Sequence, residues 1–245
     1  MSGDSAETLD RTTSTVDLAV RDIVSTPTLV IPNSPDSIGT YGESDEQFVV
    51  AAVAGLGRSS ARHESVELAG GGATYQPAEL GEITNREYLW ANGTRFRASA
   101  EETVLFTVPK PIEANEATVQ WPGGSHVLNE DTVRKLGRPP TEFEVTEFFT
   151  PKSVPSGETV TVTLVVENVG DVSGTFIGAL NRSGPSVAYT PVTSIALELK
   201  SAESATWTYS YTPYADPSDE EATMNFTMDW RGGHLSSEIT VKPDG

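Results

Sequence analysis

Residues Val154–Gly174, with the sequence VPSGETVTVTLVVENVGDVSG, decide the fold class of this chain. The residues at 155–157 (Pro-Ser-Gly) form a turn signal, and strict alternation follows them. Threonines alternate with aliphatic residues: Thr159, Thr161 and Thr163 against Val160, Val162, Leu164 and Val166. Period-2 alternation bounded by turn residues is typical of a strand with one face on a core and the other in water.

The C-terminal half of the chain repeats this pattern. Six further strands are predicted between Glu142 and Pro243: Phe143/Val145, Thr175–Leu180, Ile195/Leu197/Leu199, Trp207/Tyr209/Tyr211, Met224–Trp230 and Ile239/Val241. Seven short strands separated by turn signals predict an immunoglobulin-like β-sandwich. Trp230 closes the alternating apolar series of the stretch Met224–Trp230, so we expect it in the sandwich core.

Residues 16–137 are also predicted to be rich in strands. We expect strands at Val16–Ile23, Gln47–Leu56, Val66–Leu68, Ala73–Tyr75, Glu102–Val108 and Ala117–Trp121. Gln47–Leu56 is apolar on both faces, which predicts a central strand. Gly70–Gly72 supplies a turn that can adopt positive φ. Helical turns are expected within Pro77–Tyr88 and Asn129–Leu136, the second capped by Asn129.

The organisation of the chain follows from these patterns. Residues 1–15 carry no periodicity and are predicted to be a disordered tether. Arg138–Thr141 contains two consecutive prolines and is predicted to be a stiff linker. The predicted fold class is therefore all-β, with two tandem immunoglobulin-like β-sandwich domains at 16–137 and 142–245 that fold independently.

Charge and composition exclude several classes of partner. Sixteen Lys and Arg against 35 Asp and Glu give a net charge of −19, which disfavours nucleic acid and anionic membrane surfaces. The absence of cysteine excludes disulfides and thiolate chemistry. No apolar run approaches the roughly 18 residues that span a bilayer.

No pattern in the sequence predicts an enzyme or a cofactor. Three histidines, His63, His126 and His234, are expected in separate surface loops, and no G-x-S-x-G motif accompanies them. The adjacent acids Glu101/Glu102 and Glu220/Glu221 do not form a pair across a cleft, because neighbours in a strand point to opposite faces. We therefore predict no catalytic residues.

Three weaker features leave alternatives open. The acidic loop with Asp216, Asp219, Glu220 and Glu221 offers oxygen ligands for calcium, or is a solvated loop. Asn92, Asn181 and Asn225 lie in N-glycosylation sequons, with the first two expected in turns. Aromatic residues form a sugar-stacking platform or, more simply, pack in the core: Tyr88, Trp90, Phe96, Trp207, Tyr209, Tyr211 and Tyr214.

Several stretches resemble known families. Val154–Gly174 and the strands that follow resemble a cell-adhesion-related (CARDB-like) immunoglobulin-like domain. The segments GGGATYQP (Gly70–Pro77) and ASAEETVLFTVPKPIEANEATVQW (Ala98–Trp121) resemble the telokin-like extracellular immunoglobulin family. The acid excess with five lysines resembles proteins of extreme halophiles. The start, Met1–Ser5, resembles mature haloarchaeal lipoproteins, with Met1 where those carry a lipid-bearing cysteine.

These resemblances imply a non-catalytic extracellular or cell-surface protein that binds a protein or a glycan. The alternatives are a carbohydrate-binding accessory module of a secreted hydrolase, and a component of an archaeal virus spike or surface filament.

Overall fold

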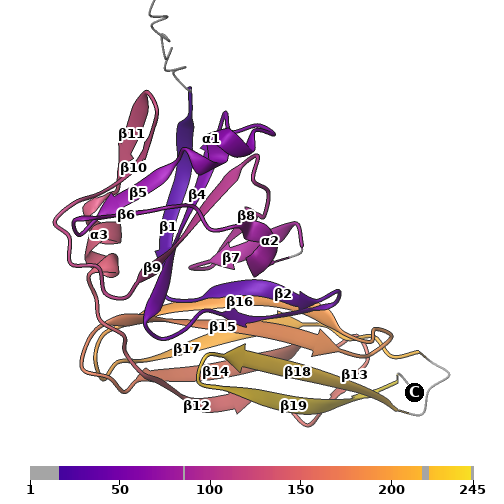
Figure 1. Ribbon diagram of the computed structural model, residues 1–245. Coiled ribbons are helices and arrows are strands. Elements are labelled where there is room, and N and C mark those ends of the chain that lie inside the picture. The colour runs from indigo at the N-terminus through magenta and orange to yellow at the C-terminus, as the bar shows by residue number, and fades with distance from the viewer. Residues whose placement is uncertain (1–16, 85, 217–220, 244–245) are drawn as a thin grey trace, which may run out of the picture.

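The computed structural model describes residues 17–84, 86–216 and 221–243 (Figure 1). Five β-sheets are formed within these residues. They stack in five layers, three from the N-terminal half of the chain and two from the C-terminal half. The all-β fold class predicted from the sequence is confirmed.

The central sheet of the N-terminal half contains the strand that the sequence predicted to be central. Its order is β1 (Ala19–Thr26), β4 (Glu46–Ala54) and β9 (Thr103–Pro109). One face packs against a sheet of β11 (Gly124–Val127), β10 (Ala117–Trp121), β5 (Glu67–Gly70) and β6 (Ala73–Tyr75), with α3 (Glu130–Leu136) alongside. Because both faces of β4 are covered, its apolar residues need no alternation.

A third sheet covers the other face of the central one and adds a layer to the expected two-sheet sandwich. Its order is β3 (Ser37–Tyr41), β2 (Leu29–Ser34), β7 (Tyr88–Ala91) and β8 (Thr94–Arg97), with α2 (Leu80–Ile83) packed beside it. These four strands, and the short helix α1 (Ser60–Glu64), were not predicted. Pro32 and Asn33 inside β2 have the composition of a turn, which hides the strand from pattern analysis.

The C-terminal half is a sandwich of two sheets. One sheet contains β12 (Phe143–Phe149), β14 (Val160–Asn168) and β17 (Ser204–Tyr211). The other contains β13 (Ser153–Pro155), β19 (Gly233–Lys242), β18 (Ala222–Trp230), β15 (Gly174–Ser183) and β16 (Thr190–Leu199). All seven strands predicted here are present, and β13 is an eighth.

Strand β15 joins the two halves because both of its faces are buried. Phe176 and Leu180 point into the sandwich core. Ile177 and Ala179 point the other way and pack against Val30 of β2. The cluster between the halves contains Val30, Ile38, Ile177 and Ala179, with Tyr88, Trp90 and Ala196 packed against it. Figure 1 shows β2 lying on β15 and β16 as a continuous stack.

Two local predictions are confirmed in atomic detail. The turn between β5 and β6 has φ of +62° at Gly71 and +77° at Gly72, the region that favours glycine. The side chain of Asn129 caps α3, because its Oδ1 accepts a hydrogen bond of 2.8 Å from the backbone N–H of Thr132.

The connection between the halves, residues 138–142, is in neither helix nor strand. Independent folding of residues 16–137 and 142–245 stays a prediction. Among the described residues, no helix has the length and apolar content to cross a membrane.

Candidate binding site between the two halves

A cavity of about 580 Å³ lies where the two halves meet, beside the linker; we call it the interhalf cavity. Four cationic side chains line it: Lys110, Lys135, Arg138 and Arg231. The acidic residue on its wall, within the described part of the chain, is the exposed Glu142. Apolar and hydroxyl side chains complete the lining, among them Trp230, Phe143, Ile177, Ser25, Ser44 and Thr175.

Gln47 fixes the N-terminal wall of the cavity. Its buried side-chain amide donates hydrogen bonds to the backbone carbonyls of Pro109, at 2.8 Å, and Leu136, at 2.9 Å. These two contacts hold the end of β9 against the end of α3. Lys110 directly follows the first carbonyl and Arg138 lies two residues after the second, so one buried amide brings both cations to the same wall.

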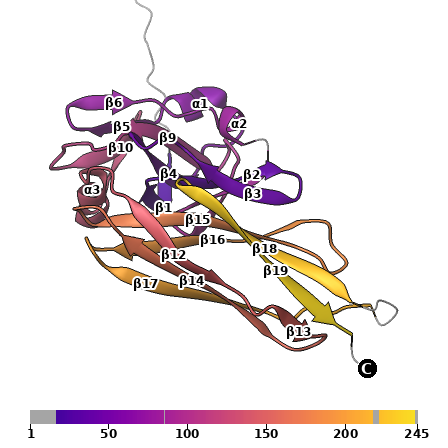
Figure 2. The ribbon, with the colours of Figure 1, turned by 90° about the horizontal axis from the view of Figure 1, so that it is seen from below.

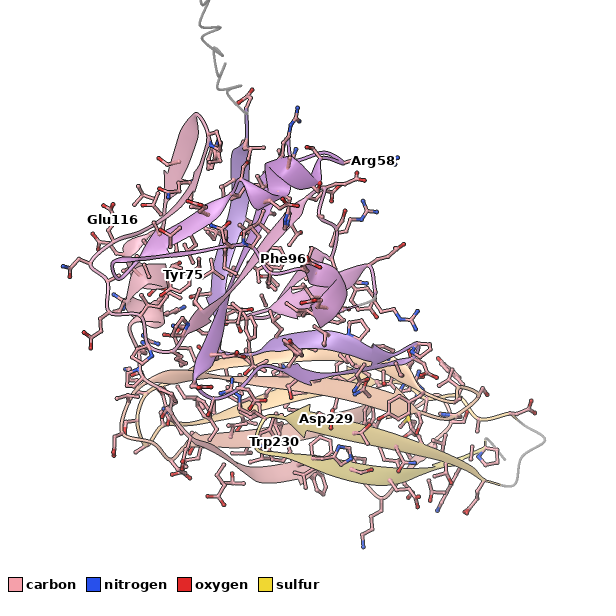
Figure 3. The ribbon with its side chains drawn as sticks, in the orientation of Figure 1. Arg58, Tyr75, Phe96, Glu116, Asp229 and Trp230 are labelled. Atoms are coloured by element: carbon pink, nitrogen blue, oxygen red, sulfur yellow. The ribbon has the colours of Figure 1, made fainter. Side chains whose placement is uncertain are left out.

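The turn between β18 and β19 forms the opposite wall. The Arg231 guanidinium donates hydrogen bonds to the carbonyl of Pro27 and the hydroxyl of Thr28, in the connection between β1 and β2. Trp230 precedes it, at the end of β18 shown in Figure 3. Its indole lies against Gly232 and Gly233, where an added Cβ would come within 2.8 Å of the ring. Figure 2 shows this turn reaching the N-terminal half.

Lys110 has an electrostatic environment that disfavours its charge. Burial, together with the positive charges of Arg231 and Arg138, lowers the pKa of Lys110 from 10.5 to about 8. Its side chain has no hydrogen bond or ion pair within the described residues. Burial also lowers the pKa of Arg231, which the charges of Glu43 and Glu46 partly oppose.

The other two cations of the cavity are paired with acids. Glu198 of β16 lies 3.0 Å from Lys135 and 3.0 Å from Arg138, so this carboxylate also links the halves. Partial burial alone would raise the pKa of Glu198, but the two hydrogen bonds outweigh it and hold that pKa below its usual value. Of the four cations of the cavity, Lys110 and Arg231 are therefore the two that no carboxylate of the described residues contacts directly.

The sequons occupy three different environments. The expectation that Asn181 lies in an accessible turn is wrong. Asn181 lies in β15, 1% exposed, and its amide is committed to Ile38, accepting from the backbone N–H and donating to the carbonyl, each at 2.8 Å. Asn92 does lie in a turn, between β7 and β8, with φ of +48°. Asn225 lies half-buried in β18, and glycosylation at either of these two stays a prediction.

The histidines do not lie in loops, which corrects the sequence-based expectation. His63 is half-buried in α1, and burial lowers its pKa while a hydrogen bond with the Thr103 carbonyl opposes the change. His126 lies in β11, and His234 lies in β19 with Nδ1 2.6 Å from Asp229. Within the described ranges no three His, Asp or Glu side chains gather to hold a metal ion.

The acidic candidates divide between exposed pairs and residues outside the described ranges. Glu101 pairs with Arg58 at 3.0 Å, and Glu102 with Arg97 at 3.5 Å, both at the surface. Of the calcium candidates, Asp219 and Glu220 lie outside the described residues. Asp216 and Glu221 are the described residues on either side of that gap. Calcium binding by this loop stays a prediction.

The aromatic residues favour the packing alternative over an exposed platform. Trp207, Tyr209 and Tyr211 pack against the sandwich core, and Phe96 is buried in the N-terminal half. Tyr88 and Trp90 pack between the halves. Tyr214 is the exception, at 69% exposed.

Trp230 differs from its predicted place. The alternation correctly assigns it to the core face of β18, but it is half-buried at the strand end and also lines the interhalf cavity. Sequence analysis missed the four cations of this site altogether. One weak signal was present: in a chain with only sixteen Lys and Arg, Lys135 and Arg138 lie close together at the start of the linker.

The likenesses to known proteins described below are structural, and each of them is weak. No protein-family model matches the chain, and no curated protein matches it. A β-glucosidase from Listeria innocua, solved with glucose, is 18% identical over 43% of this chain and 17% of its own, with a TM-score of 0.35. An alkylpurine DNA glycosylase from Pseudomonas fluorescens is 11% identical over 42% of this chain and 31% of its own, with a TM-score of 0.35.

A CARDB domain from Pyrococcus furiosus, solved with di-metal ions, is also similar. It is 16% identical over 42% of this chain and 93% of its own, with a TM-score of 0.30. At this TM-score the likeness carries no argument for the CARDB-like resemblance of Val154–Gly174, which stays a prediction. Nothing in the comparisons supports the telokin-like or haloarchaeal resemblances, and none of these likenesses carries a functional argument.

Proposed function

We propose that this chain is a non-catalytic binding protein that holds an anionic ligand in the interhalf cavity. The proposal rests on one observation: four of the sixteen Lys and Arg side chains surround a cavity of about 580 Å³ in a chain of net charge −19. The volume lies within the roughly 300–1,000 Å³ typical of small-molecule sites. An anion entering it would relieve the mutual repulsion of Lys110 and Arg231.

The proposed setting is the cell surface or the extracellular space, where the family resemblances would place an adhesion-type protein. A carbohydrate-binding accessory module is the second candidate, and the Trp230 side chain on the cavity wall favours it. Neither candidate requires a catalytic step, and both place the ligand in the interhalf cavity: an anion in the first case and a sugar in the second.

Calorimetry on the full chain tests the proposal, with acetate, citrate, phosphate and sulfate as probes at constant ionic strength. We expect saturable binding of at least one anion, lost in Lys110→Met and Arg231→Gln. Lys152→Met is the matched control, because it removes a positive charge from an exposed position far from the cavity lining. If no anion binds, or if Lys152→Met weakens binding equally, the proposal is wrong.

Salt adaptation belongs to the same proposal and has its own test. Repulsion within a surface of net charge −19 weakens as the Debye length falls to roughly 3 Å at 1 M salt. We expect the thermal unfolding midpoint to rise between about 0.1 and 2 M KCl. A midpoint that stays flat or falls would contradict the halophilic origin, but it would not bear on the proposed anion site.

A further inference from the structure

We infer that the ligand of the interhalf cavity is an acidic sugar of the hexuronate type, its carboxylate between Lys110 and Arg231 and its ring against Trp230. This inference rests on the proposed function. It adds the chemical class of the ligand and the side chains that recognise each part of it.

The charge pattern favours a carboxylate over a more highly charged group. Lys110 comes from the N-terminal half and Arg231 from the C-terminal half, and each positive charge disfavours the other. A carboxylate presents two oxygens in one plane, which suits a guanidinium on one side and an ammonium on the other. Glu43 and Glu46 also act on Arg231, so a second negative charge on the ligand would be repelled.

The indole of Trp230 gives the cavity an apolar wall beside these charges. It is held against the backbone of Gly232 and Gly233, and it lines the cavity one residue before Arg231. A pyranose ring presents C–H groups on its faces, which pack on an aromatic ring, and hydroxyls at its edge. Adjacent aromatic and cationic side chains therefore match a ring that carries a carboxylate.

The hydroxyl side chains of the wall match the remaining edge of a sugar. Ser25, Ser44 and Thr175 line the cavity, and their hydroxyls have no hydrogen-bond partner within the described residues. The hydroxyls of Thr26 and Thr28 are already engaged, with the Thr28 carbonyl and with Arg231. The free hydroxyls can donate to and accept from a polyhydroxylated ligand, which a simple carboxylate does not exploit.

The test is calorimetry on the full chain at constant ionic strength and chloride concentration. The probes are glucuronate, galacturonate, a galacturonate trimer, glucose, acetate and inorganic phosphate. We expect a uronate to bind at least about tenfold more tightly than acetate, glucose or phosphate, since it alone engages both the charges and the indole. Comparing the affinities for galacturonate and for its trimer shows whether the site takes a free sugar or the end of an oligosaccharide.

Variants assign the two parts of the ligand. Lys110→Met should weaken uronate binding about tenfold or more, as expected for the loss of a charge-assisted hydrogen bond, and Lys152→Met should leave it unchanged. Trp230→Leu should lower the affinity for uronate towards that for acetate. Because the Trp230 variant also risks unfolding, a second measurement uses the unaltered protein: uronate should protect Lys110, but not Lys152, from amine acylation read by mass spectrometry.

The outcomes separate this inference from the proposed function. If acetate or phosphate binds as tightly as any uronate, the sugar is excluded while the anion site stands. If no probe binds and Lys110 is never protected, both are wrong. Uronate binding that is as tight in Lys110→Met as in the unaltered protein would overturn the placement of the carboxylate.

Discussion

The contact between the two halves has a dry end and a charged end, and the two are built differently. At the dry end, Val30, Ile38, Ile177 and Ala179 are buried together, and Asn181 uses both atoms of its amide on the Ile38 backbone. At the charged end, the interhalf cavity leaves Lys110 half-buried among other cations. The buried contacts at the dry end stabilise the stack, whereas the half-buried charge of Lys110 at the other end costs stability, which is the arrangement expected of a binding site.

Removing the N-terminal half should cause the largest loss of stability, because it removes the partner of the dry end. The fragment Glu142–Gly245 retains the sandwich core, because Phe176 and Leu180 pack within it, so we expect it to fold. It exposes Ile177 and Ala179, and burying an isoleucine alone is worth about 1.5–3 kcal/mol.

We therefore expect the sandwich in the fragment to be at least about 3 kcal/mol less stable than in the full chain, and the fragment to bind a hydrophobic dye. Denaturant unfolding in high salt measures the first and fluorescence the second. A fragment as stable as the intact chain, with no dye bound, would show that the dry end contributes nothing.

Asn181→Leu should give the next largest effect, a loss of about 2–4 kcal/mol of unfolding free energy. The change leaves the backbone N–H and carbonyl of Ile38 without their partners at a buried site. Asn225→Ala is the matched control, since Asn225 lies half-buried in β18 and makes no side-chain hydrogen bond within the described residues. Urea unfolding compares the two; equal losses would mean that the Asn181 bonds are not what joins the halves.

Strand patterns predicted the sandwich but not the contact between the halves. The alternation of Val160–Val166 reports one buried face, and that face is correct. The apolar run in β15 indicates burial on both faces but does not identify the partner. The partner strand β2 was not predicted, because Pro32 and Asn33 give it the composition of a turn. The sequon at Asn181 gives no sign that this side chain is buried, because the backbone atoms of Ile38 that it binds are 143 residues away in the chain.

The site was less predictable than the fold. Lys110 and Arg231 are 121 positions apart in the chain, and neither belongs to a motif. Their approach depends on Gln47 bridging two carbonyls and on the β18–β19 turn meeting Thr28. Both contacts depend on the tertiary structure.

Lys110→Met should raise stability at neutral pH, opposite in sign to the changes at the dry end. The pKa of Lys110 is about 8 in the folded protein and 10.5 in the unfolded chain. The unfolded state therefore binds more protons between these values, and the contribution of Lys110 to stability rises as the pH rises through that window. With allowance for solvent screening, the variant should gain about 1 kcal/mol at pH 7.

The gain should shrink towards zero near pH 10, where the lysine is neutral in the folded state. Urea unfolding of both proteins at pH 7 and pH 10 measures this, with Lys152→Met as the control for removing one positive charge. A loss of stability at pH 7 would mean that Lys110 has a stabilising partner in the folded state. The proposed anion site requires a Lys110 ammonium without one, so this result would contradict the site.

Glu198→Gln should have the smallest effect, a loss of less than about 1 kcal/mol, because the carboxylate is 47% exposed and salt screens its pairs. The folded-state pKa of Glu198 lies below its ordinary value of 4.5, so its contribution is present above that pH and is lost as the pH falls through the folded-state pKa. In a chain of net charge −19, removing any acid also relieves repulsion, so the exposed Glu144→Gln is needed as a control. The difference between the two variants should be largest at low salt and pH 7, and it should vanish once the pH falls below the folded-state pKa of Glu198. If Glu144→Gln destabilises the protein as much as Glu198→Gln does, the pairs with Lys135 and Arg138 do not stabilise the charged end, and the hydrogen bonds of Arg231 to Pro27 and Thr28 join the two halves there instead.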